Sequence, residues 1–308
     1  MNKIFTIIVT YNAMKWIDNC IRCLIESTVH TKIIVVDNCS TDKTVEYISA
    51  AYPNVIVIQN KQNKGFGQAN NQGIELAYRN GASHFFLCNQ DLYVKPNTLG
   101  NLVEIQNKYH LSVVSPVQLN GDFSSFDGGF FSSFIENNSN IDFVSDVYLD
   151  NMSDYYETAY VPAAAWMLSK ETIHNIGGFD PLFFHYGEDN HYANRLKFHK
   201  KKLAVVPSAI VGHDRVFKGN IDAFKKYSPC STLINAFADP NDPIMILNKK
   251  RMQAIIINLR NSFLSFLRFN FKDAWLSFKS LCQFFSKLDM IKNSVITNRN
   301  INSNWLDL

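Results

Sequence analysis

Two short apolar runs in the chain end on carboxylates, a residue type that can bind a metal ion. The run His84–Cys88 is followed, after two amides, by Asp91, and the run Ile33–Val36 is followed directly by Asp37. Short uncharged runs of this kind are typical of buried strands in a parallel sheet. Ligands of open α/β sheets bind in the crevice beyond the carboxyl ends of the strands. The pattern predicts a polar, ligand-facing rim with Asp91 placed to hold a metal, although either carboxylate could instead cap a turn.

A third polar segment, Asn63-Lys64-Gly65-Phe66-Gly67, precedes an expected helix. Glycine allows a close backbone approach, and N–H groups at a helix start favour phosphate or ribose oxygens. Gly65 and Gly67 are therefore candidate ligand contacts, or they simply form a turn. The first expected strand is followed by Thr10-Tyr11-Asn12-Ala13, where a dinucleotide-binding fold would have G-x-G-x-x-G. This difference argues against NAD or FAD as a cofactor.

The first hundred residues alternate strand and helix patterns. The expected strands are Ile4–Val9, Ile33–Val36, Val55–Ile58 and His84–Cys88. The expected helices are Met14–Glu26, Asp42–Ala51, Phe66–Arg79 and Asn97–Lys108. Strands that alternate with helices of this length form βαβ units, so we expect an α/β protein with a Rossmann-like, mostly parallel sheet flanked by helices.

The pattern weakens from Leu111 to about Tyr160. The segment Asn120–Asn140 is rich in Gly, Ser, Asn and Asp and is expected to be a long loop on the acceptor side of a site. Order returns beyond it. We expect a strand or buried segment at Tyr160–Ser169, a helix through Ile176, a helix at Asp189–His199 and a strand at Leu203–Val206.

The C-terminal region has a different composition. Residues Lys249 to Lys292 contain nine Lys or Arg and two acids, interleaved with Phe, Leu, Ile and Trp275. This pattern predicts one or two amphipathic helices with a basic polar face. Such helices could lie on an anionic membrane, pack on the rest of the chain or form a dimer surface.

Composition excludes several classes of protein. The net charge of +3 is too small to indicate nucleic acid binding. The six cysteines are scattered; Cys20 and Cys23 form a C-x-x-C, but its spacing favours packing on one helix face, and a reducing cytosol is indicated. Ile4–Val9 is too short for a signal sequence, and no run approaches the roughly 20 apolar residues of a membrane span. We expect a cytoplasmic protein, or one peripheral on the inner face of the plasma membrane.

Taken in order, several motifs of the chain resemble the inverting nucleotide-sugar glycosyltransferases of family 2, which have the GT-A fold. The resemblance covers about residues 3 to 215. Within the family, the chain looks most similar to the rhamnosyltransferase-like enzymes that build bacterial O-antigen and capsule. The matching pieces are Ile7–Asn12, Val35–Asp42, Asn63–Asn71, Leu87–Asp91, Gly177–Asp180 and Phe183–Asp189.

The resemblance implies a set of roles on the donor side. Asp37 would accept the imide N–H of a uracil or thymine ring. The other donor contacts would be Thr10, Tyr11, Asn12, Asn38, Asn63, Gly65, Gly67, Asn89, Gln90 and Arg195. Asp91 would hold Mn²⁺ or Mg²⁺, and His213 would complete the metal shell or remain a simple loop residue.

On the acceptor side, the family motif makes Asp189 the general base, with Glu188 beside it. An acidic start to a helix is the structural alternative, because carboxylates there interact favourably with the helix dipole. The chain departs from the family twice. Asn89-Gln90-Asp91 replaces the usual D-x-D, so one metal-binding charge is lost, and His191 replaces a second acid and is expected on a helix surface.

Together these features predict an inverting, metal-assisted transfer of a sugar from a UDP- or dTDP-sugar to a hydroxyl of a bacterial surface glycan, free or linked to polyprenyl diphosphate. Residues 1–240 would form the catalytic domain, with about 1–110 binding the nucleotide sugar and about 111–240 facing the acceptor. Residues 241–308 would form a helical extension. Two alternatives remain: a catalytically degenerate nucleotide-sugar-binding partner in a glycan-assembly complex, and a nucleotidyltransferase, which would need a Gly-rich basic loop after the first strand.

Overall fold

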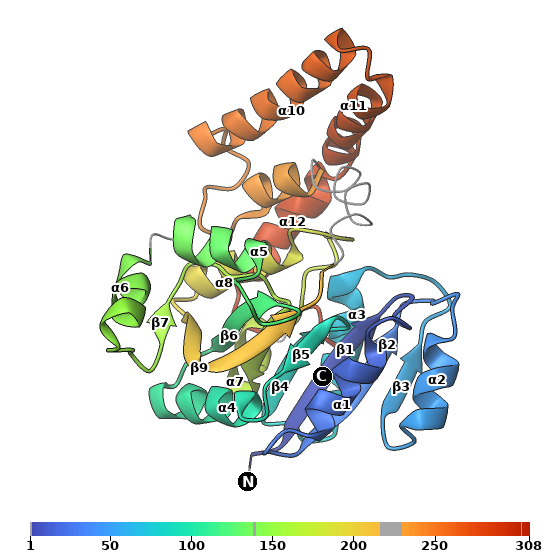
Figure 1. The fold of residues 1–308 in the computed structure, drawn as a ribbon. Helices are drawn as coiled ribbons and strands as arrows, with labels where there is room; N and C mark the ends of the chain where they lie inside the picture. The colour runs from blue at the N-terminus through green and yellow to red at the C-terminus, as the bar shows by residue number, and fades with distance from the viewer. Residues whose placement is uncertain (1, 138–139, 216–229, 303) are drawn as a thin grey trace.

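The first part of the chain folds as alternating strands and helices (Figure 1). The computed structural model describes residues 2–137, 140–215, 230–302 and 304–308. Every element expected before residue 110 is present, with bounds that differ by a few residues. These elements are β1 (Ile4–Thr10), α1 (Ile17–Ile25), β2 (Thr31–Asp37), α2 (Thr44–Ala51), β3 (Ile56–Gln59), α3 (Phe66–Arg79), β4 (His84–Asn89) and α4 (Thr98–Tyr109). The short strand β5 (Leu92–Val94) was not predicted.

One twisted sheet organises residues 4–213, which fall within the expected catalytic domain and are termed the catalytic part. Its strand order is β3-β2-β1-β4-β8-β6-β9-β5, and β7 pairs with β9. The strands β3, β2, β1 and β4 are parallel, as are β6 and β9, whereas β8 runs antiparallel to both neighbours. The later strands are β6 (Val113–Asn120), β7 (Tyr156–Glu157), β8 (Ala165–Ser169) and β9 (Leu203–His213). The expected fold class, a mixed α/β protein with a mostly parallel central sheet between helices, is confirmed.

Both faces of the central strands β1, β2 and β4 are buried, which explains their continuous apolar runs. Along β1, Phe5 and Ile7 belong to one apolar cluster, whereas Ile4 and Ile8 belong to the other. The first cluster includes residues of α3 and α8, and the second includes residues of α1 and α4. Cys20 is wholly buried in the second cluster, as expected of a packing residue.

The expectation of a long loop at Asn120–Asn140 is wrong for its central part. The structure has a short helix α5 (Gly128–Phe130), continued by the π-helix η1 (Phe131–Glu136); residues 138–139 lie outside the described residues. Contacts between aromatic rings pack this segment, although its polar composition suggested a loop. The rings of Phe130 and Phe134 are 5.1 Å apart, and those of Phe134 and Phe143 are 5.2 Å apart. Phe143 lies on α6 (Ile141–Leu149), a helix that the sequence did not predict.

Helices dominate the C-terminal half. They are α7 (Lys170–Ile176), α8 (Glu188–Phe198), a helical stretch at 230–238, α10 (Lys249–Leu267), α11 (Phe271–Ser286) and α12 (Leu288–Asn298). The amphipathic helices expected at Lys249–Lys292 are thus present, and α10 and α11 form a hairpin that projects from the catalytic part (Figure 1). Among the described residues, no helix combines the length and apolar character that crossing a bilayer requires.

The end of the chain returns to the catalytic part. Asp180 is buried and accepts hydrogen bonds from Ser294 Oγ (2.6 Å) and Asn298 Nδ2 (2.8 Å) of α12. Beyond α12, the carbonyl of Asn304 accepts a 2.9 Å hydrogen bond from the Gly178 N–H. The helix α3 also takes part, because Asn71 Nδ2 donates to the Trp305 carbonyl at 3.2 Å. The last turns therefore help to hold the loop between α7 and α8.

Candidate active site

The carboxyl ends of β1, β2 and β4 meet at one edge of the sheet. Thr10 is paired in register with Asp37, and Val9 with Asn89. The expected rim of polar side chains is therefore present, and three separate segments of the sequence contribute to it. Side chains tie the strand ends together. The backbone N–H of Tyr11 donates to Gln90 Oε1 at 2.8 Å, and Gln90 Nε2 donates to the Tyr11 carbonyl at 3.3 Å.

Asp37 is wholly buried and is held by its own turn. Its Oδ1 accepts from the Thr10 hydroxyl at 3.0 Å and from the Ser40 hydroxyl, and its Oδ2 accepts from the Ser40 N–H at 2.9 Å. A carboxylate can accept about four hydrogen bonds, so these three donors from the described residues leave one acceptor position. Asp42, and not Asp37, interacts with the start of α2, because its Oδ1 accepts from the Thr44 N–H at 3.0 Å.

Asn38 and Asn63 shape the loop that precedes α3. Asn38 Nδ2 donates to the Gly65 carbonyl at 3.0 Å, and Asn38 Oδ1 accepts from the Lys64 N–H at 3.1 Å. Asn63 Oδ1 accepts from the Gly65 N–H at 2.8 Å. The amides that the sequence suggested as donor contacts thus lie together, and in this structure they fix the loop beside the rim.

The two glycines of this loop allow close contact with the segment Phe179–Glu188, which lies in the part of the chain expected to face the acceptor. Gly65 has φ +82°, and a Cβ built on it would lie 1.9 Å from the carbonyl oxygen of Phe184. A Cβ on Gly67 would lie 2.9 Å from Cβ of Phe179 and 3.7 Å from Cβ of Glu188. The close approach that we expected toward a ligand is therefore made toward the protein itself. It brings the loop before α3 against the segment that leads to Asp189.

Asp91 and His213 lie together at the carboxyl edge. His213 ends β9 opposite Leu92 of β5, and its Nε2 is 3.3 Å from Asp91 Oδ1. His213 is almost wholly buried, whereas the side chain of Asp91 is about one-fifth exposed. The two metal ligands expected from the sequence are thus brought into contact. Within the described ranges, no group of three or more His, Cys, Asp or Glu side chains could hold a metal.

Sequence reasoning missed Asp127 and Arg215, which flank the other ring nitrogen of His213. Arg215 Nε donates to His213 Nδ1 at 3.0 Å and lies 3.0 Å from Asp127 Oδ2. Asp127 is buried, caps α5 by accepting from the Phe130 N–H, and lies 3.6 Å from His213 Nδ1. The only available signal was an Asp-Gly-Gly step inside the supposed loop, which is common in turns.

Asp189 begins α8 in a defined set of contacts. Its Oδ2 accepts from the Tyr160 hydroxyl at 2.8 Å and from the Ala163 N–H at 3.3 Å, and its Oδ1 accepts from the Asn190 N–H at 2.8 Å. Burial next to Asp189 raises the pKa of the Tyr160 hydroxyl, and the positive charge of Arg215 opposes that rise. Arg215 therefore contacts His213 and also acts electrostatically on Tyr160 beside the base candidate.

Glu188 differs from Asp189 in its surroundings. The side chain is almost wholly buried, and its Oε2 has no hydrogen-bond partner among the described residues. Burial, with the neighbouring charge of Asp189, raises the pKa of Glu188 to about 8. The carboxyl is therefore protonated at neutral pH, and Asp189 is the better candidate for a base that must be ionised to act.

The variant Glu188→Gln should change how stability depends on pH. The unfolded chain ionises Glu188 near pH 4.5, whereas the folded protein keeps the proton until about pH 8. The folded state therefore binds more protons in this window, and the free energy of unfolding of the wild type falls as pH rises through it. Glutamine does not ionise, so the stability of the variant should not fall with pH for this reason. In urea unfolding from pH 5 to 9, the free energy of unfolding of the variant should exceed that of the wild type by an amount that grows up to pH 8, on the order of a few kcal/mol. A difference that stays constant with pH would contradict the raised pKa of Glu188.

Two residues of α8 do not occupy the places that the sequence suggested. Arg195, expected to bind the donor, is wholly buried and donates to the carbonyls of Ile176 and Gly178. His191, expected on a helix surface, is also wholly buried, and its Nε2 lies 3.3 Å from the Ala238 carbonyl. The C-terminal half covers this side of α8, which an isolated helix pattern could not reveal. We therefore assign Arg195 to the interior and not to the donor site.

The sequence model described as "Glycosyl transferase family 2" matches residues 6–176. The match covers more than half of the chain and includes the β1, β2 and β4 ends. The chain belongs to this family and is a glycosyltransferase with the GT-A fold. No curated protein sequence matches it.

Solved structures agree in fold at low sequence identity. A TarS fragment from S. aureus in complex with UDP-GlcNAc has a TM-score of 0.61 at 16% identity, covering 96% of this chain and 89% of that one. GalNAc-T7 with UDP, GalNAc and Mn²⁺ has a TM-score of 0.59 at 15% identity, covering 99% and 56%. The mannosyltransferase PcManGT from Pyrobaculum calidifontis, with GDP-Man and Mn²⁺, has 0.57 at 15% identity, covering 96% and 85%. The chain spans 43% of the longer TarS structure.

Proposed function

We propose that this glycosyltransferase is inverting and metal-assisted, and that it moves a sugar from a UDP- or dTDP-sugar to a hydroxyl of a bacterial surface glycan. The observation that carries the proposal is one short network. Asp91 contacts His213. Two residues before Asp91, the Asn89 N–H donates to the Ala164 carbonyl at 2.9 Å, and the N–H of the adjacent Ala163 donates to Asp189 Oδ2 at 3.3 Å. A metal-binding pair and a candidate base therefore share one part of the molecule.

Three features support a nucleotide at the rim. Asp37 keeps one acceptor position, by the count above, for the imide N–H of uracil or thymine. The side chain of Tyr11 is exposed at the end of β1, where it could stack on a base. Asn89 Oδ1 is buried without a hydrogen-bond partner among the described residues, so a ribose hydroxyl would satisfy it. Neighbours of this fold were solved with UDP-GlcNAc, UDP or GDP-Man, which supports a nucleotide sugar as the donor.

A divalent cation fits the Asp91–His213 pair. Mg²⁺ and similar ions commonly take one or two protein ligands together with substrate phosphates, and need no complete protein cage. Asp127 and Arg215 hold the imidazole of His213 beside Asp91, which would supply the negative charge for the ion. When bound, the ion would stabilise the negative charge that develops on the departing diphosphate.

Transfer then depends on Asp189. The acceptor oxygen attacks the anomeric carbon, the bond from that carbon to the diphosphate oxygen breaks, and Asp189 takes the proton of the attacking hydroxyl. Tyr160 and the Ala163 N–H hold the carboxylate in one orientation. The neighbouring Glu188, with its raised pKa, stays neutral and does not compete for the proton. We propose that about 1–110 bind the donor and that about 111–240 face the acceptor.

A thermal-shift series with UDP-, dTDP- and GDP-sugars, each with and without Mn²⁺, tests the donor and metal assignments together. A ligand that binds only the folded protein raises the melting temperature. We expect a shift with one nucleotide class that increases with Mn²⁺. Asp91→Asn should remove the Mn²⁺-dependent part and keep the rest.

An exposed carboxylate outside the site provides the matched control. Asp122→Asn should leave the Mn²⁺ effect intact. A wild-type shift that does not respond to Mn²⁺ would overturn the metal assignment. No shift with any donor, and no slow release of nucleotide without acceptor, would favour the degenerate binding partner, for which the loss of one carboxylate at Asn89 is the motivating feature.

A further inference from the structure

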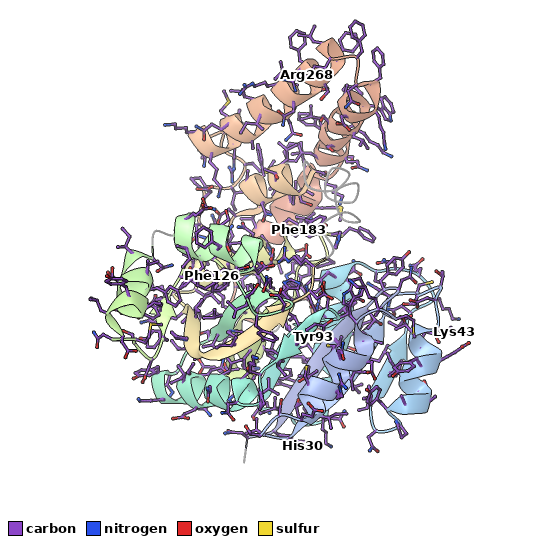
Figure 2. All side chains as sticks on the ribbon, viewed as in Figure 1. His30, Lys43, Tyr93, Phe126, Phe183 and Arg268 are labelled. Atoms are coloured by element: carbon purple, nitrogen blue, oxygen red, sulfur yellow. The ribbon has the colours of Figure 1, made fainter. Side chains whose placement is uncertain are left out.

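The hairpin of α10 and α11 presents large apolar side chains to solvent. In the stretch from Leu259 to Phe278, Ala274 is the one buried residue. Figure 2 shows rings projecting outward around the end of the hairpin, where Arg268 is labelled. Apolar exposure on this scale marks an interaction site in a soluble protein. The exposed aromatic residues of this end are Phe263, Phe266, Phe269, Phe271, Trp275 and Phe278.

A helix pair in water usually buries its large apolar side chains between the helices. In this hairpin the large apolar side chains face outward. Small or polar residues meet between the helices, as at Ser262, whose Oγ donates to the Ala274 carbonyl at 3.2 Å. The large residues face outward and repeat along each helix. Met252, Ile256, Leu259, Phe263 and Phe266 follow a helical stripe on α10, and α11 repeats the same spacing from Phe271. Small residues between helices and large apolar residues outside suit an apolar environment.

Charge favours a particular environment. Arg260, Arg268 and Lys272 are exposed at this end, and Asp273 is the one acid between residues 259 and 278. The apolar residues of α6, such as Tyr148 and its neighbours, are exposed to a similar degree, but they alternate with aspartates. Basic residues combined with exposed aromatics are typical of segments that bind anionic lipid surfaces.

We propose that the α10–α11 hairpin binds the surface of a membrane that contains anionic lipids. The aromatic end enters the boundary between headgroups and acyl chains, and Arg260, Arg268 and Lys272 contact lipid phosphates. Neither helix is long and apolar enough to span a bilayer, so the hairpin lies at the interface. A second copy of the chain suits this surface less well, because two like-charged hairpins repel.

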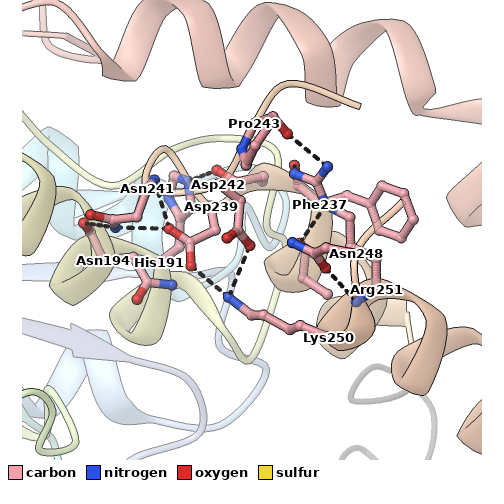
Figure 3. A network of polar contacts seen from close by, with 12 residues as sticks. His191, Asn194, Phe237, Asp239, Asn241, Asp242, Pro243, Asn248, Lys250 and Arg251 are labelled. Carbon is pink, nitrogen blue, oxygen red and sulfur yellow. Dashed lines mark hydrogen bonds and ion pairs between the residues drawn. The ribbon is translucent and has the colours of Figure 1, made fainter. Parts of the chain in front are cut away.

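The base of the hairpin is fixed to the catalytic part. At the start of α10, Lys250 Nζ is 2.5 Å from Asp239 Oδ2 and 3.6 Å from Asp242 Oδ2 (Figure 3). Arg251 beside it is wholly buried and donates to the Pro243 carbonyl at 2.8 Å (Figure 3). The hairpin therefore cannot swing freely about this end.

The end of α11 is attached to the segment that precedes the candidate base. Lys287 Nζ donates to the Leu182 carbonyl at 3.3 Å, and Phe183 and Phe284 belong to one buried cluster. The segment at Leu182 and Phe183 leads directly into α8 and Asp189. Given the proposed function, a membrane-bound hairpin would present the acceptor side to lipid-linked glycans. The docking itself does not depend on that function.

Flotation of the full chain with vesicles tests the proposal. We expect binding to vesicles of phosphatidylcholine with phosphatidylglycerol, weaker binding to phosphatidylcholine alone, and loss of the difference at high salt. The triple variant Phe266→Ser/Phe269→Ser/Phe271→Ser should bind roughly tenfold or more weakly. Arg260→Gln/Arg268→Gln/Lys272→Gln should lose the preference for phosphatidylglycerol.

Matched control variants distinguish vesicle binding by this surface from nonspecific binding. Val147→Ser/Tyr148→Ser/Leu149→Ser removes equally exposed apolar residues from α6, and Lys43→Gln/Lys197→Gln/Lys200→Gln removes three exposed charges elsewhere. Both should bind vesicles as the wild type does. Urea unfolding checks that every variant is folded, and nucleotide release without acceptor should be unchanged in the aromatic variant, so failure of docking is distinct from failure of the proposed chemistry.

Three outcomes would overturn the proposal. The wild type could fail to float with either vesicle, or the α6 variant could lose as much binding as the hairpin variant. Light scattering could instead show an oligomer that the hairpin variant dissociates, without vesicle binding by the wild type. That last result would assign the hairpin to a second copy of the chain.

Discussion

Replacing Asp189 with asparagine should lower the rate of transfer by roughly 10²- to 10⁴-fold while nucleotide-sugar binding is retained. The amide has nearly the same shape as the carboxylate. It can still accept the hydrogen bonds that Tyr160 and the Ala163 N–H donate to Asp189 Oδ2 at 2.8 and 3.3 Å. An amide is not basic, however, and it cannot take the proton of an attacking hydroxyl. The loss should therefore fall on the chemical step.

The measurement is nucleotide release with water as the acceptor, together with donor affinity by thermal shift. Asp142→Asn is the matched control, because Asp142 is an exposed acid in the first turn of α6 and its replacement removes the same favourable interaction with a helix dipole. It should leave turnover unchanged. Normal turnover in Asp189→Asn would remove Asp189 as the base, and loss of donor binding would assign it a structural role.

Among substitutions that add one methyl group near the site, Gly65→Ala should lower the free energy of unfolding most. Gly65 has φ +82°, which strains any residue with a Cβ, and the new methyl would lie 1.9 Å from the Phe184 carbonyl oxygen. Backbone strain and overpacking each cost about 1–3 kcal/mol, so their sum is roughly 2–6 kcal/mol. Because relief of the clash must move the Phe184 segment, which leads to Asp189, activity should fall as well.

Gly81→Ala separates the two contributions. Gly81 has φ +78°, but a Cβ there would meet nothing closer than Lys3 Nζ at 3.6 Å. Gly81→Ala should introduce the backbone strain without the clash, so its free energy of unfolding should fall by only about 1–3 kcal/mol. Urea unfolding of both variants gives the comparison. Equal losses would mean that the Phe184 segment moves aside easily, and that the contact between donor-side and acceptor-side loops is not a fixed part of the fold.

The parallel half of the sheet was predictable because its strands are uniform. Runs such as Ile33–Val36 are buried on both faces and are separated by helices with clear periodicity. β6 was missed because Pro116 and two polar residues interrupt its pattern. In the structure, the register between β6 and β9 shifts between Pro116 and Val117, which is a place where a strand tolerates proline. A sequence pattern does not show that such an irregular strand has neighbours on both sides.

The same limit applies to the site. The sequence indicated Asp91, Asp189 and His213 as candidate site residues because each follows or begins a recognisable element. It could not locate Asp127, which stabilises the surroundings of His213 from a turn whose position depends on aromatic packing. It also placed His191 in solvent and Arg195 at the donor, because the burial of both depends on helices that are distant in the sequence.

The attachment of the last turns to the catalytic part has a consequence for synthesis. The carbonyl of Asn304 accepts from the Gly178 N–H, and α12 supplies the donors that bond the buried carboxylate of Asp180. A ribosome makes these partners more than a hundred residues after the loop that needs them. The strands of the parallel half can pair while the chain is still emerging, but Asp180 Oδ2 in the turn before α8 lacks its donors until α12 has been made. Active protein should therefore appear only after translation has passed residue 304, however early the sheet has formed.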